Sequence, residues 1–369
     1  QSNQYLKGIG IDPFLGVSDD DGDQTPSGII RPQGMVTASA ALLNATPFWH
    51  ILNPVNLLHY FYLSNGRVVS YASGFTGETN VGTPTAGAGN GAAYYNDYIY
   101  FATPTDISRY GPLSGAPAIA NTYWTVTLGL TALSNSATAS IRGSLNYPNH
   151  AMHLHVDNKL YFCDYTAGIG YIHYLRTTAA GVNDVSTYNA LDLPPGFVPT
   201  DIESWGNDIV VAANQGGSVT LHQGRACLFF WDTLSDSFYN MVWLPDSYVS
   251  ALSNQNGRLL VWSGVPSSGT DTSRGYRISE YQGGQTLREI YSTPNGQLPI
   301  QGGIEGYRDR FMWATFEQVQ TTTSSAPQYY GVVKSYDNGA VHTIYNTRAA
   351  ATTSDGVATT VRFFQGAGT

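Results

Sequence analysis

The stretch "VSALSNQNGRLLVWSG", residues 249–264, contains two runs of alternating side-chain character that are separated by Asn256-Gly257. Alternation with a period of two residues is typical of a β-strand. Asn-Gly is a common centre of tight hairpin turns, because both residues tolerate positive φ angles. The stretch therefore predicts an antiparallel hairpin.

The same form, a polar turn pair before a short apolar strand, occurs in four other segments. These segments are "YNDYIYFAT" (95–103), "VDNKLYFCD" (156–164), "GNDIVVAAN" (206–214) and "YRDRFMWAT" (307–315). The second turn residues lie 61, 50, 49 and 52 residues apart, at Asp97, Asn158, Asp208, Gly257 and Asp309. The sequence therefore contains an internal repeat of about 50 residues, and the interval from Asp97 to Asn158 is longer.

A second hairpin follows each of these turns by about 25 residues. The clearest examples are residues 276–292 and 330–346, and looser ones are residues 171–193 and 227–244. An early hairpin at residues 57–72 indicates one further unit before Asp97. Each unit thus contains two hairpins, or four strands.

A four-stranded unit of this size cannot cover both of its faces alone, whereas units packed radially cover one another. We therefore predict an all-β fold, a β-propeller of six four-stranded blades, with seven blades as the alternative. Residues 1–30 do not match the repeat and are predicted to form an arm or linker, leaving residues 31–369 for the propeller. We expect residues 28–39 or 358–366 to complete the first blade and close the ring.

The composition argues against two classes of partner. Only 12% of the residues are charged, the net charge is -9, and the three lysines stand beside 14 arginines, so no basic stripe for nucleic acid is present. No run approaches the roughly 18 apolar residues of a membrane span. The chain begins with Gln1, which suggests a processed or incomplete start. Together with the low charge and scarce lysine, this favours an extracellular or virion-surface setting.

The two cysteines, Cys163 and Cys227, each lie in an apolar run. We predict two buried free thiols, with a disulfide between neighbouring elements as the alternative.

Histidines gather in "NHAMHLHVD", residues 149–157. On a strand, His153 and His155 point to the same face, so we predict that they line the central channel and contact a ligand. A metal site is the alternative, with His173 as a third ligand from the neighbouring hairpin.

The segment "SDDDGDQT" clusters carboxylates around a glycine. Asp19, Asp21 and Asp23 offer the oxygen ligands that calcium prefers, but Val17 and Gly28 stand where a calcium-binding loop of the EF-hand type needs acids. We predict a solvated acidic turn, with a weak Ca²⁺ site as the alternative and no other cofactor.

Carboxylates recur near the predicted first strands, at Asp201, Glu203, Glu305 and Asp309. A pair of them in a channel mouth would suit glycoside hydrolysis. The sequence contains no nucleophile elbow, zinc-protease helix or phosphate-binding loop, so we expect no enzymatic activity.

Tryptophans are the other candidates for ligand contact. Trp262 and Trp313 occupy equivalent repeat positions, which indicates core packing between blades. Trp49 and Trp205 lie outside the repeat core, so we predict that they stack on a saccharide.

The repeat over residues 57–349 resembles that of β-propeller proteins, and the composition and arm resemble bacteriophage tail and other virion-surface proteins. These resemblances imply a non-enzymatic structural and interaction propeller whose partners are other protein subunits of an extracellular or virion assembly. The alternatives are a glycan-binding adhesin that contacts cell-surface glycans and, third, a polysaccharide-degrading enzyme.

Overall fold

The computed structural model contains six four-stranded antiparallel sheets in the part of the chain that it describes, and we number them sheets 1 to 6 in chain order. The described residues are 11–12, 17–18, 24–25, 28–29, 47–53, 57–63, 66–72, 78–84, 91–133, 150–177, 184–215, 224–264, 275–294, 304–305, 311–319, 328–337 and 340–346.

Within each sheet, strands that are consecutive in the chain pair with one another. The strands are β5 (Pro47–Leu52), β6 (His59–Leu63), β7 (Val68–Tyr71) and β8 (Thr79–Gly82) in sheet 1; β9 (Ala92–Tyr95), β10 (Tyr98–Ala102), β11 (Ile107–Gly111) and β12 (Ala118–Ala120) in sheet 2; β13 (Met152–Leu154), β14 (Leu160–Thr166), β15 (Ile169–Thr177) and β16 (Asp184–Asp192) in sheet 3; β17 (Phe197–Trp205), β18 (Asp208–Gln215), β19 (Arg225–Trp231) and β20 (Asn240–Trp243) in sheet 4; β21 (Tyr248–Gln255), β22 (Arg258–Gly264), β23 (Tyr276–Gly283) and β24 (Thr286–Thr293) in sheet 5; and β25 (Ile304–Glu305), β26 (Phe311–Val319), β27 (Gln328–Asp337) and β28 (Ala340–Asn346) in sheet 6.

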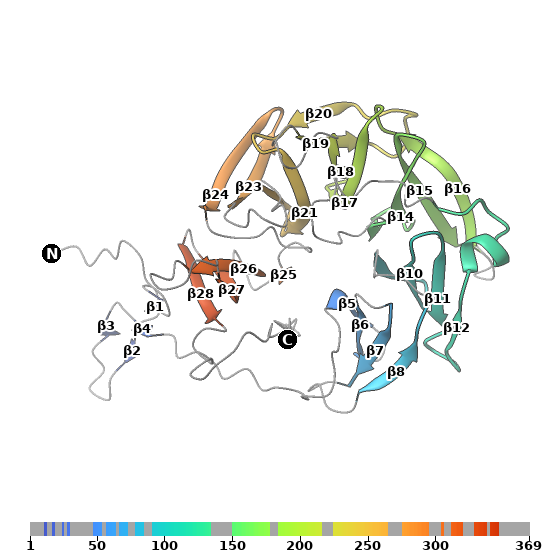
Figure 1. Cartoon of the computed structure of the whole chain (residues 1–369), viewed down its shortest axis with the longest axis horizontal. Helices are drawn as coiled ribbons and strands as arrows, with labels where there is room; N and C mark the ends of the chain where they lie inside the picture. The colour runs from blue at the N-terminus through green and yellow to red at the C-terminus, as the bar shows by residue number, and fades with distance from the viewer. Residues whose placement is uncertain are drawn as a thin grey trace.

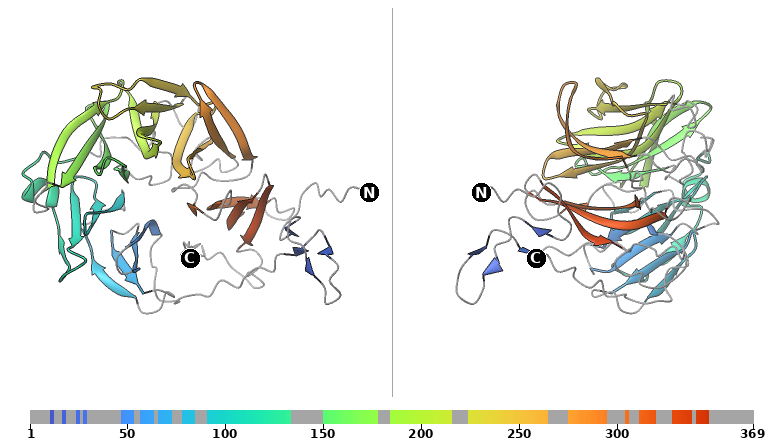
Figure 2. Two further views of the ribbon diagram at one scale, coloured as in Figure 1. Left: turned by 180° about the vertical axis from the view of Figure 1, so that it is seen from behind. Right: turned by 60° about the vertical axis from the view of Figure 1, so that its left-hand side comes forward.

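The sheets stand side by side around a common centre, with first strands such as β5, β17 and β21 innermost and fourth strands such as β20 and β24 at the rim (Figure 1). The view from behind shows the same arrangement (Figure 2). This arrangement is a β-propeller, so the predicted fold class is confirmed. The number of blades in the whole chain, six or seven, stays a prediction.

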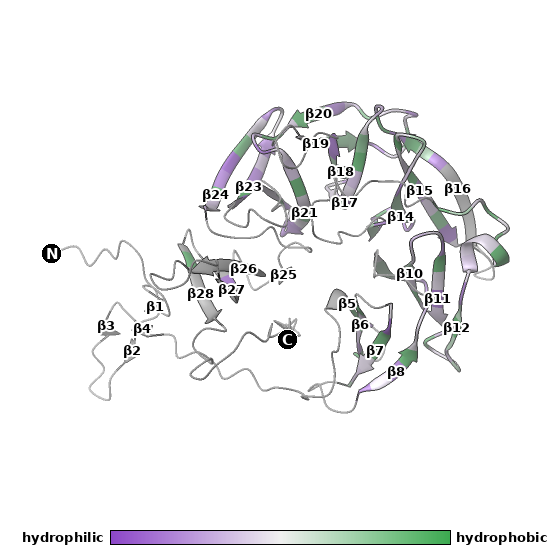
Figure 3. Ribbon diagram, in the orientation of Figure 1, coloured by the Kyte–Doolittle hydropathy of each residue, from purple (hydrophilic) through white to green (hydrophobic). Residues whose placement is uncertain are grey.

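Burial decreases from the inner strands to the rim. The six central residues of β18 are buried, whereas no residue of β24 is. Figure 3 shows the same change, from hydrophobic colours on β18 to mostly hydrophilic colours on β24. An inner strand is covered on both faces by the neighbouring sheets, which is why it forms a continuous apolar run rather than a half-exposed alternation.

The core lies between the sheets. One cluster joins sheets 1 to 4, and Tyr62, Phe101, Tyr161 and Phe229 belong to it. The Tyr62 hydroxyl also donates to the Ala102 carbonyl across sheets 1 and 2, at 2.8 Å. Both cysteines lie in the same cluster, buried and free, as predicted.

Two of the tryptophans confirm the core prediction made from their repeat positions. Trp262 and Trp313 are fully buried in a cluster that joins sheets 5 and 6. The Trp313 indole donates to the Tyr276 hydroxyl across these sheets, at 2.7 Å.

Sheet 1 corrects the expectation that a terminal segment completes the first blade. Its four strands all come from residues 47–82, because "PFWHIL" forms the inner strand β5. No strand from residues 28–39 or 358–366 is needed: β4 (Gly28–Ile29) pairs with β1 (Ile11–Asp12), and residues 358–366 lie outside the described residues.

The predicted hairpin turns are largely as expected. Asp97, Asn158 and Gly257 have positive φ angles of 68°, 60° and 81°. In sheet 4 the expected turn residue, Asp208, is instead the first residue of β18 and pairs with Trp205. The turn there is Gly206-Asn207, with Gly206 at a φ of 64°.

The longer repeat interval has a structural explanation in sheet 2. After β12 the chain forms one π-helical turn, η1 (Tyr123–Thr127). The buried Asp106 carboxylate accepts hydrogen bonds from the Ile107 and Trp124 amides, at 2.7 and 3.0 Å, and so fixes η1 to the start of β11.

The described residues near the N-terminus form two ribbons, β1 with β4 and β2 (Val17–Ser18) with β3 (Gln24–Thr25). Asp19, Asp21 and Asp23 lie outside the described residues, so the Ca²⁺ site stays a prediction, as does the boundary between arm and propeller. Among the described residues, no helix has the length and apolar character to cross a membrane.

Candidate functional site

The candidate site lies on the edge of the wheel where the inner strands end in hairpin turns. We call this the turn edge, and it includes residues 155–159 of sheet 3, 206–207 of sheet 4 and 256–257 of sheet 5. The opposite edge, where β17 and β21 begin, is the entry edge.

Four polar side chains of sheets 3 and 4 meet at the turn edge, and we call them the histidine–serine cluster: His153, His155, Glu203 and Ser204. His153 Nε2 and His155 Nδ1 each lie 2.7 Å from Ser204 Oγ. His153 Nδ1 lies 3.2 Å from Glu203 Oε1. The two histidines therefore share a face, as the strand period predicts, and their common neighbour is a serine.

The hydrogen bonds fix the protons on His155 and Ser204. His155 Nε2 lies 3.0 Å from the Asn207 carbonyl oxygen, which can only accept, so Nε2 carries the proton. Burial lowers the pKa of His155, which keeps the ring neutral and leaves Nδ1 as an acceptor. The Ser204 hydroxyl therefore donates to His155.

His153 completes the network. Because the single proton of Ser204 is directed to His155, His153 Nε2 must donate to Ser204 Oγ. Glu203 Oε1 accepts from the Ser204 amide at 2.9 Å and lies 3.2 Å from His153 Nδ1, so the network extends from Ser204 through His153 to Glu203.

The cluster has the connectivity of a nucleophile, base and carboxylate, but its geometry favours a structural role. A nucleophilic serine needs an oxygen that is open to the substrate and aligned with one base. Ser204 is buried, and its oxygen lies between two imidazole rings. The cluster therefore links sheet 3 to sheet 4 through hydrogen bonds.

The partners within the cluster follow the repeat period. Ser204 lies 51 and 49 residues after His153 and His155. The next pair of sheets repeats the spacing, since Asn254 Nδ2 donates to the Ser204 carbonyl 50 residues away at 2.8 Å. Residues one repeat apart on neighbouring inner strands thus lie side by side. This signal was available in the sequence, and it would have identified Ser204.

Asp201 is a second link between inner strands. Its carboxyl accepts hydrogen bonds from the Ile202 amide at 2.9 Å and from the Leu252 amide of sheet 5 at 2.7 Å. Burial nevertheless raises the pKa of Asp201 to about 8. Asp201 and Glu203 both lie on the first strand β17, in agreement with the prediction that carboxylates lie near first strands. Asp309 lies outside the described residues.

His173 does not join the cluster. His173 Nε2 lies 3.5 Å from Asp164 Oδ2, and His150 Nδ1 lies 3.6 Å from Asp164 Oδ1. All three side chains are fully buried. Within the described ranges, no three His, Cys, Asp or Glu side chains are grouped so that they could hold a metal ion. The proposed set of His153, His155 and His173 is therefore not assembled.

The two tryptophans predicted to contact saccharide take part in packing. Trp49 is only 9% exposed and belongs to the core of sheets 1 to 4. Trp205 packs edge-on against Tyr281 of sheet 5, with ring centroids 4.9 Å apart. Ligand contact by Trp49 or Trp205 stays a prediction.

Large apolar side chains are exposed beside the histidine–serine cluster. Val156 is 68% exposed, and Leu234 and Tyr239 of the β19–β20 connection are 88% and 56% exposed. Tyr239 donates to Asp208 at 2.7 Å, which ties it to the turn edge of sheet 4. Tyr161 of sheet 3 hydrogen-bonds Thr233, the neighbour of Leu234. The exposed residues thus lie on adjoining parts of two sheets.

Comparisons with known proteins identify the fold. No protein-family model and no curated protein matches the sequence. The β-propeller domain of Swd1 from Myceliophteria thermophila is similar in structure, with a TM-score of 0.51 and 9% identity over 82% of this chain and 85% of that chain. The chain is a β-propeller. A provisional 6-phosphogluconolactonase from Bacteroides fragilis gives a TM-score of 0.52 and 11% identity over 81% of this chain and 83% of that chain. At these identities the likeness carries the fold alone.

Proposed function

We propose that the chain is a non-enzymatic structural and interaction propeller, which docks another protein subunit at its turn edge within an extracellular or virion assembly. The observation that carries the proposal is the exposure of Val156, Leu234 and Tyr239 on adjoining turns of sheets 3 and 4.

Docking would bury these side chains. Removing a valine, leucine or tyrosine side chain from water contributes about 1.5–3 kcal/mol, and such anchors supply most of the affinity of a protein interface. The turn with Val156 directly follows His155 of the histidine–serine cluster, and the connection with Leu234 is held by Asp232, which accepts from the Leu234 and Ser235 amides at 3.0 and 2.8 Å. Little ordering is therefore required on binding. Charged groups lie next to them, since the ion pair of Asp157 and Lys159 follows Val156 in the turn and Asp208 accepts from Tyr239, as in the polar rim of an interface.

The setting is supported by composition. A chain with 12% charged residues and three lysines carries its surface polarity on neutral groups. An extracellular or virion surface suits this composition, and the partner is then a further subunit of the same assembly. A glycan-binding role is favoured by a different observation, the exposure of Trp243 on the entry edge.

Lys159 provides the test, because it lies on the turn edge, where its amine contacts Asp157 at 2.8 Å. The assembly that contains the chain is isolated from its native source and treated with an amine-reactive cross-linker. We expect cross-links from Lys159 to a different polypeptide, identified by mass spectrometry.

Variants make the test specific. Leu234→Asp together with Val156→Asp should abolish these cross-links, whereas Arg225→Gln on the entry edge should leave them unchanged. A chain that sediments as a monomer in its native source, or cross-links that survive the double substitution, would refute docking at the turn edge.

A further inference from the structure

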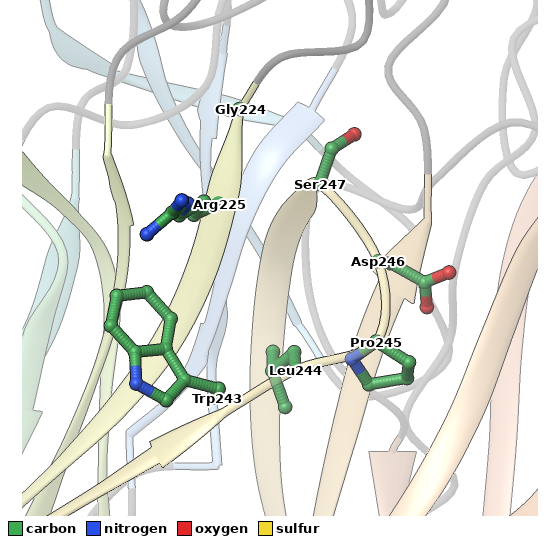
Figure 4. Close-up of a pocket in the computed structure, with 7 residues that line it drawn as sticks. All are labelled: Gly224, Arg225, Trp243, Leu244, Pro245, Asp246 and Ser247. Atoms are coloured by element: carbon green, nitrogen blue, oxygen red, sulfur yellow. The ribbon is translucent and has the colours of Figure 1, made fainter.

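A hollow of about 460 Å³ opens on the entry edge of sheet 4, where the chain passes to sheet 5 (Figure 4). Its size lies within the range of ligand-binding sites. The lining residues are Gly224, Arg225, Trp243, Leu244, Pro245, Asp246 and Ser247.

Trp243 forms one wall of the hollow and is 43% exposed. Its ring is held from behind by Phe197, with centroids 5.9 Å apart, and the Arg225 guanidinium lies 5.8 Å from its centroid. Figure 4 shows the guanidinium and the indole next to each other on the same side of the hollow. Arg225 and Trp243 lie on the same face of sheet 4, because Trp243 pairs with Cys227, which is two residues after Arg225 on β19.

The charge of Arg225 is available to a ligand. Arg258, Arg277 and Arg288 of sheet 5 all pair with carboxylates, whereas no carboxylate among the described residues pairs with the exposed Arg225. The nearest acid of the lining, Asp246, points away from Arg225 in Figure 4. Its carboxylate contacts Arg277 Nε at 2.7 Å and accepts from the Ser263 hydroxyl at 2.6 Å.

The lining also contains a serine and close backbone segments. The Ser247 hydroxyl oxygen is buried, so it does not face the hollow, and it has no hydrogen-bond partner within the described part of the chain. Gly224 lets the backbone approach the Ser247 carbonyl closely, since a Cβ there would lie 2.8 Å from that oxygen. The hollow therefore combines an aromatic wall with one cation that has no carboxylate partner among the described residues.

We propose that this hollow binds an acidic saccharide of the uronic-acid class. The apolar face of a pyranose ring stacks on Trp243, and its carboxylate accepts hydrogen bonds from Arg225. A single cation matches a single carboxylate. A phosphate-rich ligand would need several cations and would be repelled by Asp246 and by the net charge of -9.

Titration calorimetry with defined trisaccharides tests the proposal. The probes are the trimers of galacturonate, glucuronate and mannuronate, each compared with its methyl ester, which keeps the ring but removes the charge. We expect at least one acid to bind, with a dissociation constant at least tenfold below that of its ester.

Substitutions in the hollow assign the two contacts. Trp243→Ala should weaken binding of the acid at least tenfold, and Trp243→Phe should restore part of it. Arg225→Gln should abolish the preference for the acid over the ester. Tyr239→Ala, which removes an exposed aromatic ring from the opposite edge, should leave the dissociation constant unchanged. The midpoint of thermal unfolding reports whether each variant is folded.

The proposal is overturned if none of the acids binds, if acid and ester bind equally to the wild type, or if folded Trp243→Ala binds like the wild type. These results are independent of docking at the turn edge, because the cross-links from Lys159 are measured on the other side of the wheel.

Discussion

Sheet 4 carries polar groups at both ends of its strands, and the two ends differ in how these groups are paired. At the turn edge, the Ser204 hydroxyl contacts two imidazoles at 2.7 Å. At the entry edge, Arg225 has no carboxylate partner and Ser247 Oγ has no hydrogen-bond partner among the described residues. The difference shows that residue type alone does not identify a binding site in this fold.

The radial geometry explains the difference. Ser204 lies on the inner strand β17, where the neighbouring sheets are close and supply His153, His155 and Asn254. Trp243 lies on the rim strand β20, where the sheets diverge (Figure 1). Ser204 is therefore enclosed by partners from the neighbouring sheets, whereas one side of Trp243 remains exposed.

The largest expected effect distinguishes a buried tryptophan from an exposed one. Trp262→Ala should lower the free energy of unfolding by about 3–5 kcal/mol, because it empties a fully buried site between sheets 5 and 6. Trp243→Ala should lower it by less than about 1 kcal/mol. Urea denaturation measures both values, and equal losses would contradict the assignment of Trp243 to an open site.

Acid should destabilise the regions that enclose histidines. Burial lowers the pKa of His155 and His173, and burial together with the nearby His59 lowers the pKa of His50 to about 4. In the unfolded chain these groups titrate near 6.5. Between pH 6.5 and 4 the unfolded chain therefore binds more protons than the folded chain, so stability is lost as the pH falls.

The contribution of His50 can be measured separately. It should amount to roughly 2 kcal/mol between pH 7 and pH 5. Urea denaturation across this range should give a shallower pH dependence for His50→Gln, while Trp243→Ala keeps the slope of the wild type. Stability that stays constant or rises on acidification would show that these histidines are not held neutral.

Two serines provide a smaller and closely matched contrast. Ser204→Ala should cost about 1–2 kcal/mol, because both histidines lose a hydrogen-bond partner in a buried site. Ser247→Ala removes a hydroxyl without such a partner in the described residues and should change stability by less than about 0.5 kcal/mol. If the two substitutions had the same effect on denaturant midpoints, the contrast between the two edges would fail.

The smallest expected effect is an absence of covalent labelling at Ser204. A fluorophosphonate probe, which labels activated serines, should leave Ser204 unmodified, because its oxygen is enclosed by His153 and His155. Peptide mapping by mass spectrometry detects the adduct. Stoichiometric labelling at Ser204, absent from Ser204→Ala, would reassign the cluster as catalytic.

The sequence predicts most of the fold because each sheet repeats a local signal, a turn pair followed by an apolar strand. It does not reveal β5, because the connection to β6 lacks an Asn-Gly or Asp-Gly pair and instead places Leu57 at a φ of 56°. The turn in sheet 4 is misplaced because Gly206, Asn207 and Asp208 are all acceptable turn residues, and only pairing of Trp205 with Asp208 distinguishes them.

The sequence predicts less of the candidate sites than of the fold. The strand period places His153 and His155 on one face, but Ser204 becomes their partner only through packing of sheet 3 on sheet 4. Solvent exposure separates Trp243 from the other tryptophans, and exposure depends on the distance of a strand from the axis. A search for polar residues one repeat apart would recover the first relation, whereas the second requires the structure.

Hydrogen exchange tests the central claim that the turn edge is the docking surface. Amide exchange of the isolated chain is compared with that of the chain within its native assembly. We predict slower exchange in the assembly at residues 155–160 and 232–239, and unchanged exchange at residues 224–225 and 244–247. Identical exchange of the turn edge in both states would contradict the claim.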